Sequence, residues 1–158
     1  MNWKVENGTI SDAGTIAEFQ FEMALESEGT VLNRDKILNG VKAGLSDPAK
    51  GMYYLVRTES GETAGSLLVT KEWSDWNNCW YWWIQSVFIK PEYRRQGAFT
   101  YLYETVRTLA KRDGSASLRL YVDRNNLKAR ECYGKQGMDE CHYLMYEEIL
   151  HRSLTKIR

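Results

Sequence analysis

The sequence predicts a single α/β domain over residues 1–158, a mixed sheet with helices on both faces. Residues 80–89 are apolar almost throughout, which is typical of a central strand that is covered on both sides. Residues 97–112 place apolar side chains at helical spacing, and residues 118–122 form another apolar segment. Together these segments predict a strand, a crossover helix and a second strand parallel to the first.

The first half of the chain predicts a strand, two helices and two further strands. Residues 3–9 form the first strand, and a helix begins at Ser11 or Asp12 and is interrupted by Gly29. A second helix begins at Asn33 or Asp35, and Asp47-Pro48 ends it. Strands are expected at residues 52–57 and 63–71, with turns at 59–62 and 74–78.

The last forty residues predict one more helix and one more strand. Residues 126–136 read as a short helix that Gly137 ends, and residues 138–149 as a final strand. The predicted order is therefore β-α-α-β-β-β-α-β-α-β.

The net charge and the cysteines of the chain exclude some classes of function and indicate a cellular compartment. The chain has 21 basic and 21 acidic residues, so we expect no nucleic-acid partner. Cys79, Cys132 and Cys141 form no CxxC pair, and with His142 and His151 as the only histidines we expect no metal site. Neither a leader nor a spanning segment is visible, so we expect a cytoplasmic protein without a membrane partner.

The segment that follows the apolar stretch has the properties of an anion site. It runs from Val87 through Lys90-Pro91 to Gly97, where a helix opens. Helix N-termini favour anions, and a glycine lets the backbone approach a ligand closely. Arg94 and Arg95 add positive charge, so a pyrophosphate would fit. Neither a Walker motif nor a Gly-x-Gly-x-x-Gly dinucleotide motif is present.

Two motifs resemble those of the GNAT superfamily of N-acetyltransferases. Arg94-x-x-Gly97, after a strand that ends before a proline, resembles the family's acyl-CoA-binding motif. Residues 126–138 resemble its Asn-x-x-Ala-x-x-x-Tyr-x-x-x-Gly-Phe signature, with Met138 in place of the phenylalanine. The predicted order of elements matches the family fold as well, so the resemblance covers nearly the whole chain.

The resemblance implies acetyl-CoA as co-substrate and a role for each matching residue. Asn126 would contact the pantetheine arm, and the Tyr133 hydroxyl would protonate the leaving thiolate. The strand backbone at Val87, Phe88 and Ile89 would bind the pantetheine amides. The pyrophosphate loop would consist of Arg94, Arg95, Gln96, Gly97, Ala98, Phe99 and Thr100. Phe99 departs from the small residue usual in the family, and we expect its side chain to point away from the phosphates.

The general base is not identified by the sequence. Many family members carry a glutamate on the central strand, where this chain has Trp83, Gln85 and Ser86. The alternatives are a water relay or one of four side chains elsewhere: Glu22, Glu26, Glu28 or His142.

Three functions remain open at this point. The first is acetyl transfer to a primary amine of a small molecule or peptide, by direct attack without a covalent acyl-enzyme. The second is a non-catalytic acyl-CoA-binding module, and the third is a protein-interaction domain. The third would use a cluster of aromatic residues as its binding surface. The same residues could instead belong to the core, line an acceptor pocket or form a homodimer interface. The cluster consists of Trp73, Trp76, Trp80, Tyr81, Trp82 and Trp83.

Overall fold

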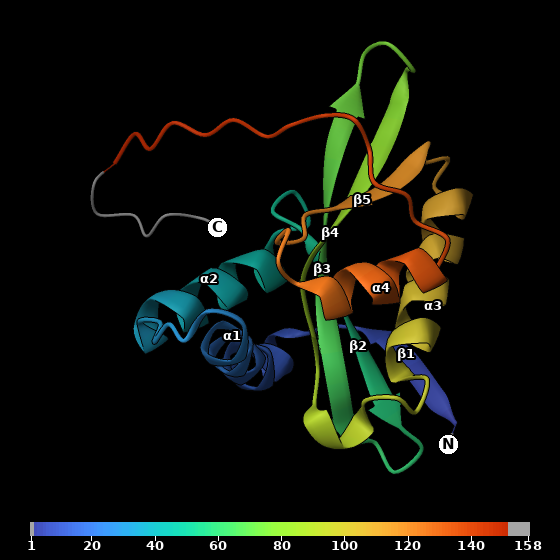
Figure 1. Ribbon diagram of the computed structural model, residues 1–158. Coiled ribbons are helices and arrows are strands. Elements are labelled where there is room, and N and C mark those ends of the chain that lie inside the picture. Colours follow the sequence, from blue (N-terminus) through green and yellow to red (C-terminus); the bar gives the residue numbers. More distant parts are fainter. Residues whose placement is uncertain (1, 152–158) are drawn as a thin grey trace. The chain divides into compact units, whose positions relative to one another are not determined.

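Five strands form one sheet in the computed structural model, which describes residues 2–151 (Figure 1). The strands lie side by side in chain order: β1 (Trp3–Asn7), β2 (Met52–Thr58), β3 (Thr63–Ser74), β4 (Cys79–Ile89) and β5 (Ser117–Leu120). The first three junctions are antiparallel, and β4 and β5 are parallel. The predicted α/β class with a mixed sheet is confirmed.

Helices cover both faces of this sheet. A short 3-10 turn η1 (Ile10–Asp12), then α1 (Ala13–Glu28) and α2 (Arg34–Ser46), follow β1, and α3 (Ala98–Arg112) joins β4 to β5. α1 and α2 lie on one side of the strands and α3 on the other (Figure 1). The helix ends follow local rules: Asn33 Oδ1 accepts from Lys36 N at 2.9 Å, and Gly29 ends α1 with φ of 62°.

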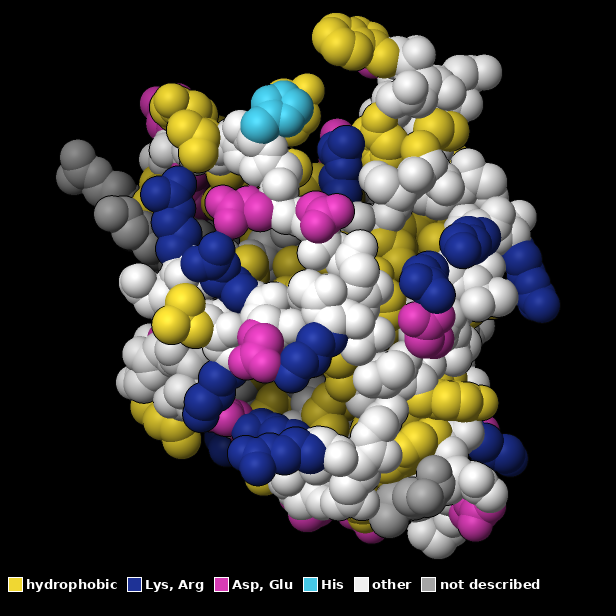
Figure 2. All heavy atoms as spheres, turned by 45° about the vertical axis from the view of Figure 1, so that its right-hand side comes forward, with side chains coloured by type: hydrophobic (Ala, Val, Ile, Leu, Met, Phe, Trp, Pro, Cys, Tyr) yellow, Lys and Arg dark blue, Asp and Glu magenta, His cyan; other side chains and the backbone are white. Residues whose placement is uncertain are grey.

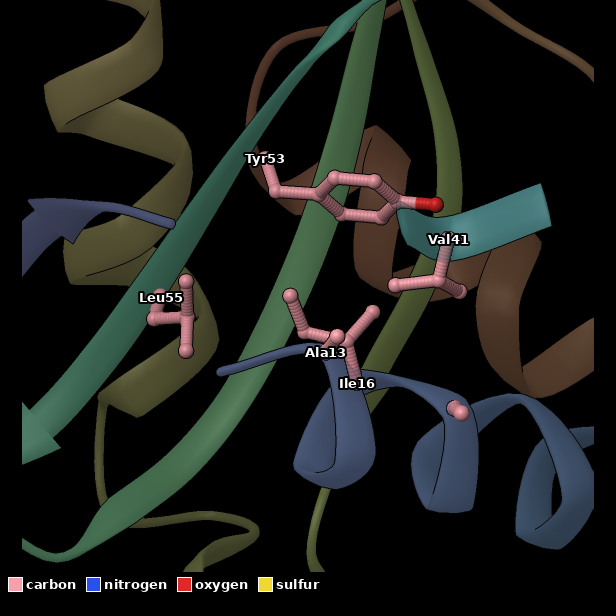
Figure 3. Packing of buried hydrophobic residues seen from close by; sticks show 6 residues of the cluster. Ala13, Ile16, Val41, Tyr53 and Leu55 are labelled. Carbon is pink, nitrogen blue, oxygen red and sulfur yellow. The ribbon is translucent and has the colours of Figure 1, made fainter. Parts of the chain in front are cut away.

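Side chains of β2 alternate between the two helical layers. Tyr53 and Leu55 point to one face, where they pack with Ile16 of α1 and Val41 of α2 (Figure 3). Met52 and Tyr54 point to the other face and line a hollow with Leu109 of α3. Because both faces are covered, β2 is nearly all buried.

The predicted parallel crossover from β4 through α3 to β5 is confirmed. The buried Trp82 of β4 anchors it, since its Nε1 donates to Asp113 Oδ2 (3.0 Å) just after α3. Burial of β4 on both faces is only partly as expected. Trp82 and Ile84 are buried, whereas Tyr81 and Trp83 on the opposite face are half-buried.

The chain divides into two compact units, a first that ends at Leu120 and a second that begins at Tyr121. In the second unit α4 (Leu127–Lys135) forms as predicted, and Gly137 with φ of 84° follows it. The final strand predicted at residues 138–149 was wrong. Residues 138–151 form neither helix nor strand, and residues 139–151 are all exposed. An extended segment becomes a strand only when it exchanges backbone hydrogen bonds with a neighbouring strand, and among residues 2–151 no strand pairs with this segment.

Candidate functional site

The loop between β4 and α3 has the backbone shape of an anion cradle. After the 3-10 turn η2 (Pro91–Tyr93), Arg95 takes φ of 60° and Gly97 takes φ of 86°. When residues with right-handed and left-handed backbone conformations alternate, their neighbouring N–H groups point toward one position, where an anion can bind. α3 begins at Ala98, and its first intrahelical donor is Tyr101 N, which bonds to Gly97 O at 2.9 Å. The loop therefore presents a helix N-terminus to whatever binds there.

Two other parts of the first unit, β1 and the turn between β2 and β3, hold this loop in place. Trp3 Nε1 of β1 donates to Gln96 O (3.1 Å), and the Trp3 ring meets Tyr93 edge-on at 5.7 Å between centroids. The Tyr93 hydroxyl donates to Glu62 at 2.6 Å, and Lys90 Nζ donates to the other Glu62 oxygen at 2.8 Å. The bond to Glu62 raises the pKa of Tyr93 to about 12, so the phenol stays a donor.

Arg94, which was expected to add positive charge to the anion site, is bound to other groups of the first unit. Its NH1 and NH2 bond to the two Glu26 oxygens of α1 at 2.6 and 2.7 Å, and its Nε donates to Ile89 O at 2.8 Å. The bond to Glu26 raises the pKa of Arg94 further. Arg94 thus ties α1 to the end of β4, while Arg95 is exposed.

Phe99 lies where a small residue is usual in the resembling motif. Its ring packs along α3, 6.0 Å from the Tyr103 ring one turn further on. Ala98 beside it is buried. The ring therefore has a packing partner on the body of the helix.

β4 is bulged beside the predicted pantetheine-binding residues. Gln85 pairs with Leu68 and Phe88 with Ser66, so Ser86 and Val87 together oppose the single residue Leu67. Ser86 takes φ of 50° at this point. A bulge re-aims backbone groups and is common near active sites. The sequence carried no signal for it, because serine is not a residue that favours positive φ.

Beyond this bulge, β4 runs on without β5 at its side. β5 pairs only with residues from Tyr81 to Ile84. Within residues 2–120 no strand pairs with Val87 to Ile89 on that side of β4. The side chains of Phe88 and Ile89, in the same part of β4, are buried.

The second unit holds the other two predicted site residues. Asn126 is the N-cap of α4: its Oδ1 accepts from Ala129 N at 3.1 Å, which leaves the Nδ2 donors for a ligand. Tyr133 is half-buried on the same helix, and burial raises the pKa of its hydroxyl. Burial also raises the pKa of the adjacent Cys132 thiol, so it is a poor nucleophile.

The candidate bases lie in different settings. Glu26 is bound to Arg94, and Glu22, one turn earlier on α1, also acts electrostatically on Arg94 and Lys90. Both therefore belong to the surroundings of the loop. Glu28 is the last residue of α1, and His142 stacks on Tyr143 with ring centroids 4.2 Å apart.

The aromatic cluster separates into core and surface. Trp82 is buried, whereas Trp76 at the tip of the β3–β4 hairpin is 92% exposed. Trp73 and Trp80 face each other across this hairpin, edge to face with ring centroids 5.0 Å apart, and they are 49% and 39% exposed. The hairpin tip is therefore an apolar surface.

One face of the molecule shows mixed charge (Figure 2). On the face in Figure 2, Lys and Arg side chains are interspersed with Asp, Glu and uncharged ones. Among residues 2–151 no three His, Cys, Asp or Glu side chains are grouped as metal ligands. None of the helices in this range is long and apolar enough to cross a membrane. An open hollow of about 340 Å³ lies near the C-terminal end of α3, beside Arg112 and Asp113, at the opposite end from the loop.

Comparison with known proteins identifies a matching family and several structures with the same fold. A model described as the acetyltransferase (GNAT) family matches residues 15–138. A possible acetyltransferase from Clostridium difficile 630 is 37% identical, with 96% of this chain and 100% of that chain covered and a TM-score of 0.88. No curated protein matches the sequence.

Two more distant structures share the fold. One is a ribosomal-protein-alanine N-acetyltransferase from Brucella melitensis biovar Abortus 2308, with 14% identity, 95% and 100% coverage and a TM-score of 0.77. The other is an aminoglycoside acetyltransferase from an uncultured soil metagenomic sample, with 16% identity, 96% and 100% coverage and a TM-score of 0.71.

Proposed function

Because the chain belongs to the GNAT acetyltransferase family, we propose that it moves the acetyl group of acetyl-CoA to a primary amine. The acceptor amine attacks the thioester directly in a ternary complex. The observation that carries the proposal is the loop before α3, where Arg95 and Gly97 take positive φ at a helix N-terminus. Such a backbone at a helix N-terminus is typical of sites that bind phosphate and pyrophosphate groups.

In this proposal the loop from Arg94 to Thr100 binds the pyrophosphate through its backbone. Gly97 suits that role because the space beside its Cα is open. A Cβ built there would have Trp3 Nε1, at 3.9 Å, as its nearest neighbour. Arg95 supplies the exposed positive charge, and Arg94, held by Glu26, fixes the shape of the loop.

The pantetheine arm is assigned to the bulged part of β4. Val87, Phe88 and Ile89 have backbone groups on the side where β5 is missing, and an extended arm with two amides would complete the ladder. A backbone N–H near Val87 would then polarise the thioester carbonyl, in the manner of an oxyanion hole.

Chemistry at the thioester needs one proton removed and one supplied. A carbon–nitrogen bond forms, the carbon–sulfur bond breaks, the amine loses a proton and the thiolate gains one. Tyr133 is assigned the second step, since its raised pKa keeps the hydroxyl protonated at neutral pH. Asn126 is assigned to the pantetheine arm through Nδ2. The base is assigned to a water relay, since Glu26 is already bound to Arg94.

The acceptor class is a primary amine of a small molecule or peptide. The two fold neighbours named above bear names that refer to a ribosomal-protein alanine and to aminoglycosides. Together these names span both kinds of amine acceptor. The proposal includes a homodimer and a single N-acetyltransferase domain over residues 1–158. It also includes the cytoplasm as the compartment, because all three cysteines are free thiols.

Thermal unfolding with and without acetyl-CoA tests the first half of this proposal. A ligand at about 100 times its Kd stabilises the native state by about 2.7 kcal/mol, which shifts Tm by several degrees. Free adenine nucleotide is the control, since it lacks the arm assigned to β4. No shift at millimolar acetyl-CoA would contradict the proposal.

Release of free thiol from acetyl-CoA across a panel of primary amines tests the second half. Amine-dependent release supports the enzyme. A clear thermal shift without release for any small amine or peptide would indicate the non-catalytic binding module instead.

A further inference from the structure

The hollow of about 340 Å³ near the C-terminal end of α3 has no part in the proposed function. We propose that it binds a small aromatic monocarboxylate, whose carboxylate accepts from the Tyr54 hydroxyl and from Arg112 while its ring packs on the apolar floor. The inference does not depend on the acetyl-transfer chemistry. The lining residues all belong to the first unit: Met52, Tyr54, Lys71, Trp82, Leu109, Arg112 and Asp113.

The Tyr54 hydroxyl is a buried donor without a strong acceptor. Tyr54 is 5% exposed and lines the hollow. Among residues 2–151 its hydroxyl makes a single hydrogen bond, to the Met52 sulfur at 3.9 Å, and a thioether is a weak acceptor. Burial, and then the charge of Asp113, raises the pKa of Tyr54, so the hydroxyl keeps its proton. A buried donor in this state is costly, and an oxygen of a ligand would satisfy it.

Positive charge around the hollow exceeds negative charge. Lys71 Nζ donates to Asp113 Oδ2 at 2.6 Å, and the same oxygen accepts from Trp82 Nε1 at 3.0 Å, so Lys71 already balances this carboxylate. Arg112 is exposed and forms no ion pair within residues 2–151. Lys111 lies in the same last turn of α3, where cations offset the negative end of the helix dipole. The lining thus has one unbalanced positive charge, which suits a monoanion better than a phosphate dianion.

The floor of the hollow favours a ring. Met52 of β2, Leu109 of α3 and the buried Trp82 of β4 all contribute apolar surface to it. Thioether and aromatic side chains pack favourably against aromatic groups. The volume lies near the lower end of the range of small-molecule sites, about 300–1,000 Å³. A single ring with a short acidic side chain fits these limits.

The hollow and the loop around Gly97 lie at opposite ends of α3. This helix runs along one face of the sheet, from Ala98 beside the loop to Arg112 beside the hollow (Figure 1). Its 15 residues span about 22 Å. A ligand in the hollow would therefore bind together with acetyl-CoA rather than in its place.

NMR titration of the isotopically labelled full-length protein tests the proposal, because two indole N–H groups report on the two ends of α3. Trp82 Nε1 bonds to Asp113 beside the hollow, and Trp3 Nε1 bonds to Gln96 O in the loop. Phenylacetate is the probe. It should move the Trp82 signal with a Kd of about 1–10 mM and leave the Trp3 signal in place.

Phenylacetamide is the matched control ligand, since it has the same shape without the charge. It should bind at least about fivefold more weakly than phenylacetate, because hydrogen bonds to charged groups are the stronger ones. Equal affinities for the acid and the amide would overturn the proposal. The same holds if the Trp82 signal does not respond to phenylacetate at several times the expected Kd.

Two variants locate the carboxylate within the hollow. Tyr54→Phe and Arg112→Gln should each weaken phenylacetate binding by at least about fivefold. Lys111→Gln is the matched control, because it removes the same charge from the same turn at a residue that does not line the hollow, and it should change the Kd by less than about twofold. Unchanged affinity in both Tyr54→Phe and Arg112→Gln would overturn the proposal.

Tyr54→Phe also gives a readout without any ligand. Its Tm should not fall, since the hydroxyl that is lost has only a sulfur atom as its partner. A fall of several degrees would show that the hydroxyl has a strong acceptor in the folded protein, and would remove the basis of the proposal.

Adding acetyl-CoA to the same samples separates this proposal from the proposed function. If acetyl-CoA moves the Trp3 signal while phenylacetate moves the Trp82 signal, both proposals stand. If the protein does not respond to acetyl-CoA and phenylacetate still moves the Trp82 signal, the proposed function fails and the site in the hollow stands. Displacement of acetyl-CoA by phenylacetate would show that the probe binds elsewhere, and would overturn the site in the hollow.

Discussion

The Arg94 guanidinium and the Glu26 carboxylate form a two-pronged ion pair, with N–O distances of 2.6 and 2.7 Å. The pair joins α1 to the loop that precedes α3. The two residues are 68 positions apart in the chain. In the proposed function, Arg94 therefore positions the loop, and Arg95 supplies the exposed charge.

Glu26→Gln should therefore weaken acetyl-CoA binding by about fivefold, because the loop loses a fixed anchor worth about 1 kcal/mol. Calorimetric titration measures the effect. Glu18→Gln is the matched control, since Glu18 holds Arg34 in the same forked way (2.8 and 3.2 Å) on another part of α1. Equal affinities for the two variants would show that Arg94 needs no anchor.

Gly97→Ala should lower both stability and acetyl-CoA affinity. An alanine at φ of 86° costs about 1–2 kcal/mol in unfolding free energy. Gly61→Ala, at φ of 89° in the β2–β3 turn with open space around it, should cost the same stability. Denaturant melts with and without acetyl-CoA separate the two effects, and only the Gly97 variant should lose the ligand-induced stabilisation.

Tyr133→Phe should reduce kcat by about 10²- to 10⁴-fold with the Kd for acetyl-CoA nearly unchanged, because only the proton donor is removed. Steady-state thiol release and titration of the same preparation give the two numbers. Cys132→Ala is the companion variant and should keep full turnover, since no covalent acyl-enzyme is expected. A parallel fall in affinity and turnover would make Tyr133 a packing residue.

Asp12 should supply stability that disappears in acid. It accepts from Arg57 NH2 (2.6 Å) and from Thr9 N (2.9 Å), and although burial alone would raise its pKa, these bonds leave its pKa below the usual value. A lowered pKa means that the stabilisation is present above the unfolded value of about 4 and is lost as pH falls below it.

Asp12→Asn should thus cost about 1–3 kcal/mol of unfolding free energy at neutral pH and progressively less below about pH 4. Urea melts at a series of pH values show this convergence. Asp75→Asn, in the exposed β3–β4 turn, is the control and should run parallel to the unchanged protein. A cost that stays constant through pH 3 would point to packing rather than charge.

Much of the fold followed from local patterns. The amphipathic stripe after Gly97 and the glycine stops at Gly29 and Gly137 are short-range signals, and the helices formed as expected. β5 proved shorter than predicted, ending at Leu120 instead of residue 122. Strand ends depend on where the neighbouring strand stops, which no local pattern contains.

The loop around Gly97 could be identified from its residue types, but its supports could not. Trp3, Glu26 and Glu62 reach it from β1, α1 and the β2–β3 turn, each through a single side chain. The periodic patterns of a sequence report on neighbours within one helix or strand, so they do not indicate contacts between residues this far apart in the chain. The bulge at Ser86 was missed for the same reason, since the register between β3 and β4 created it.

The sequence by itself determined the helices, most strands, the parallel crossover and the glycine at the start of α3, because backbone propensity and spacing act over a few residues. Tertiary structure alone decided that Arg94 is bound to Glu26, that β4 is bulged at Ser86, and that residues 138–149 are not a strand in the single chain. These outcomes depend on partners distant in sequence. A side chain or an extended backbone segment takes its final role only when folding brings such a partner within hydrogen-bond reach.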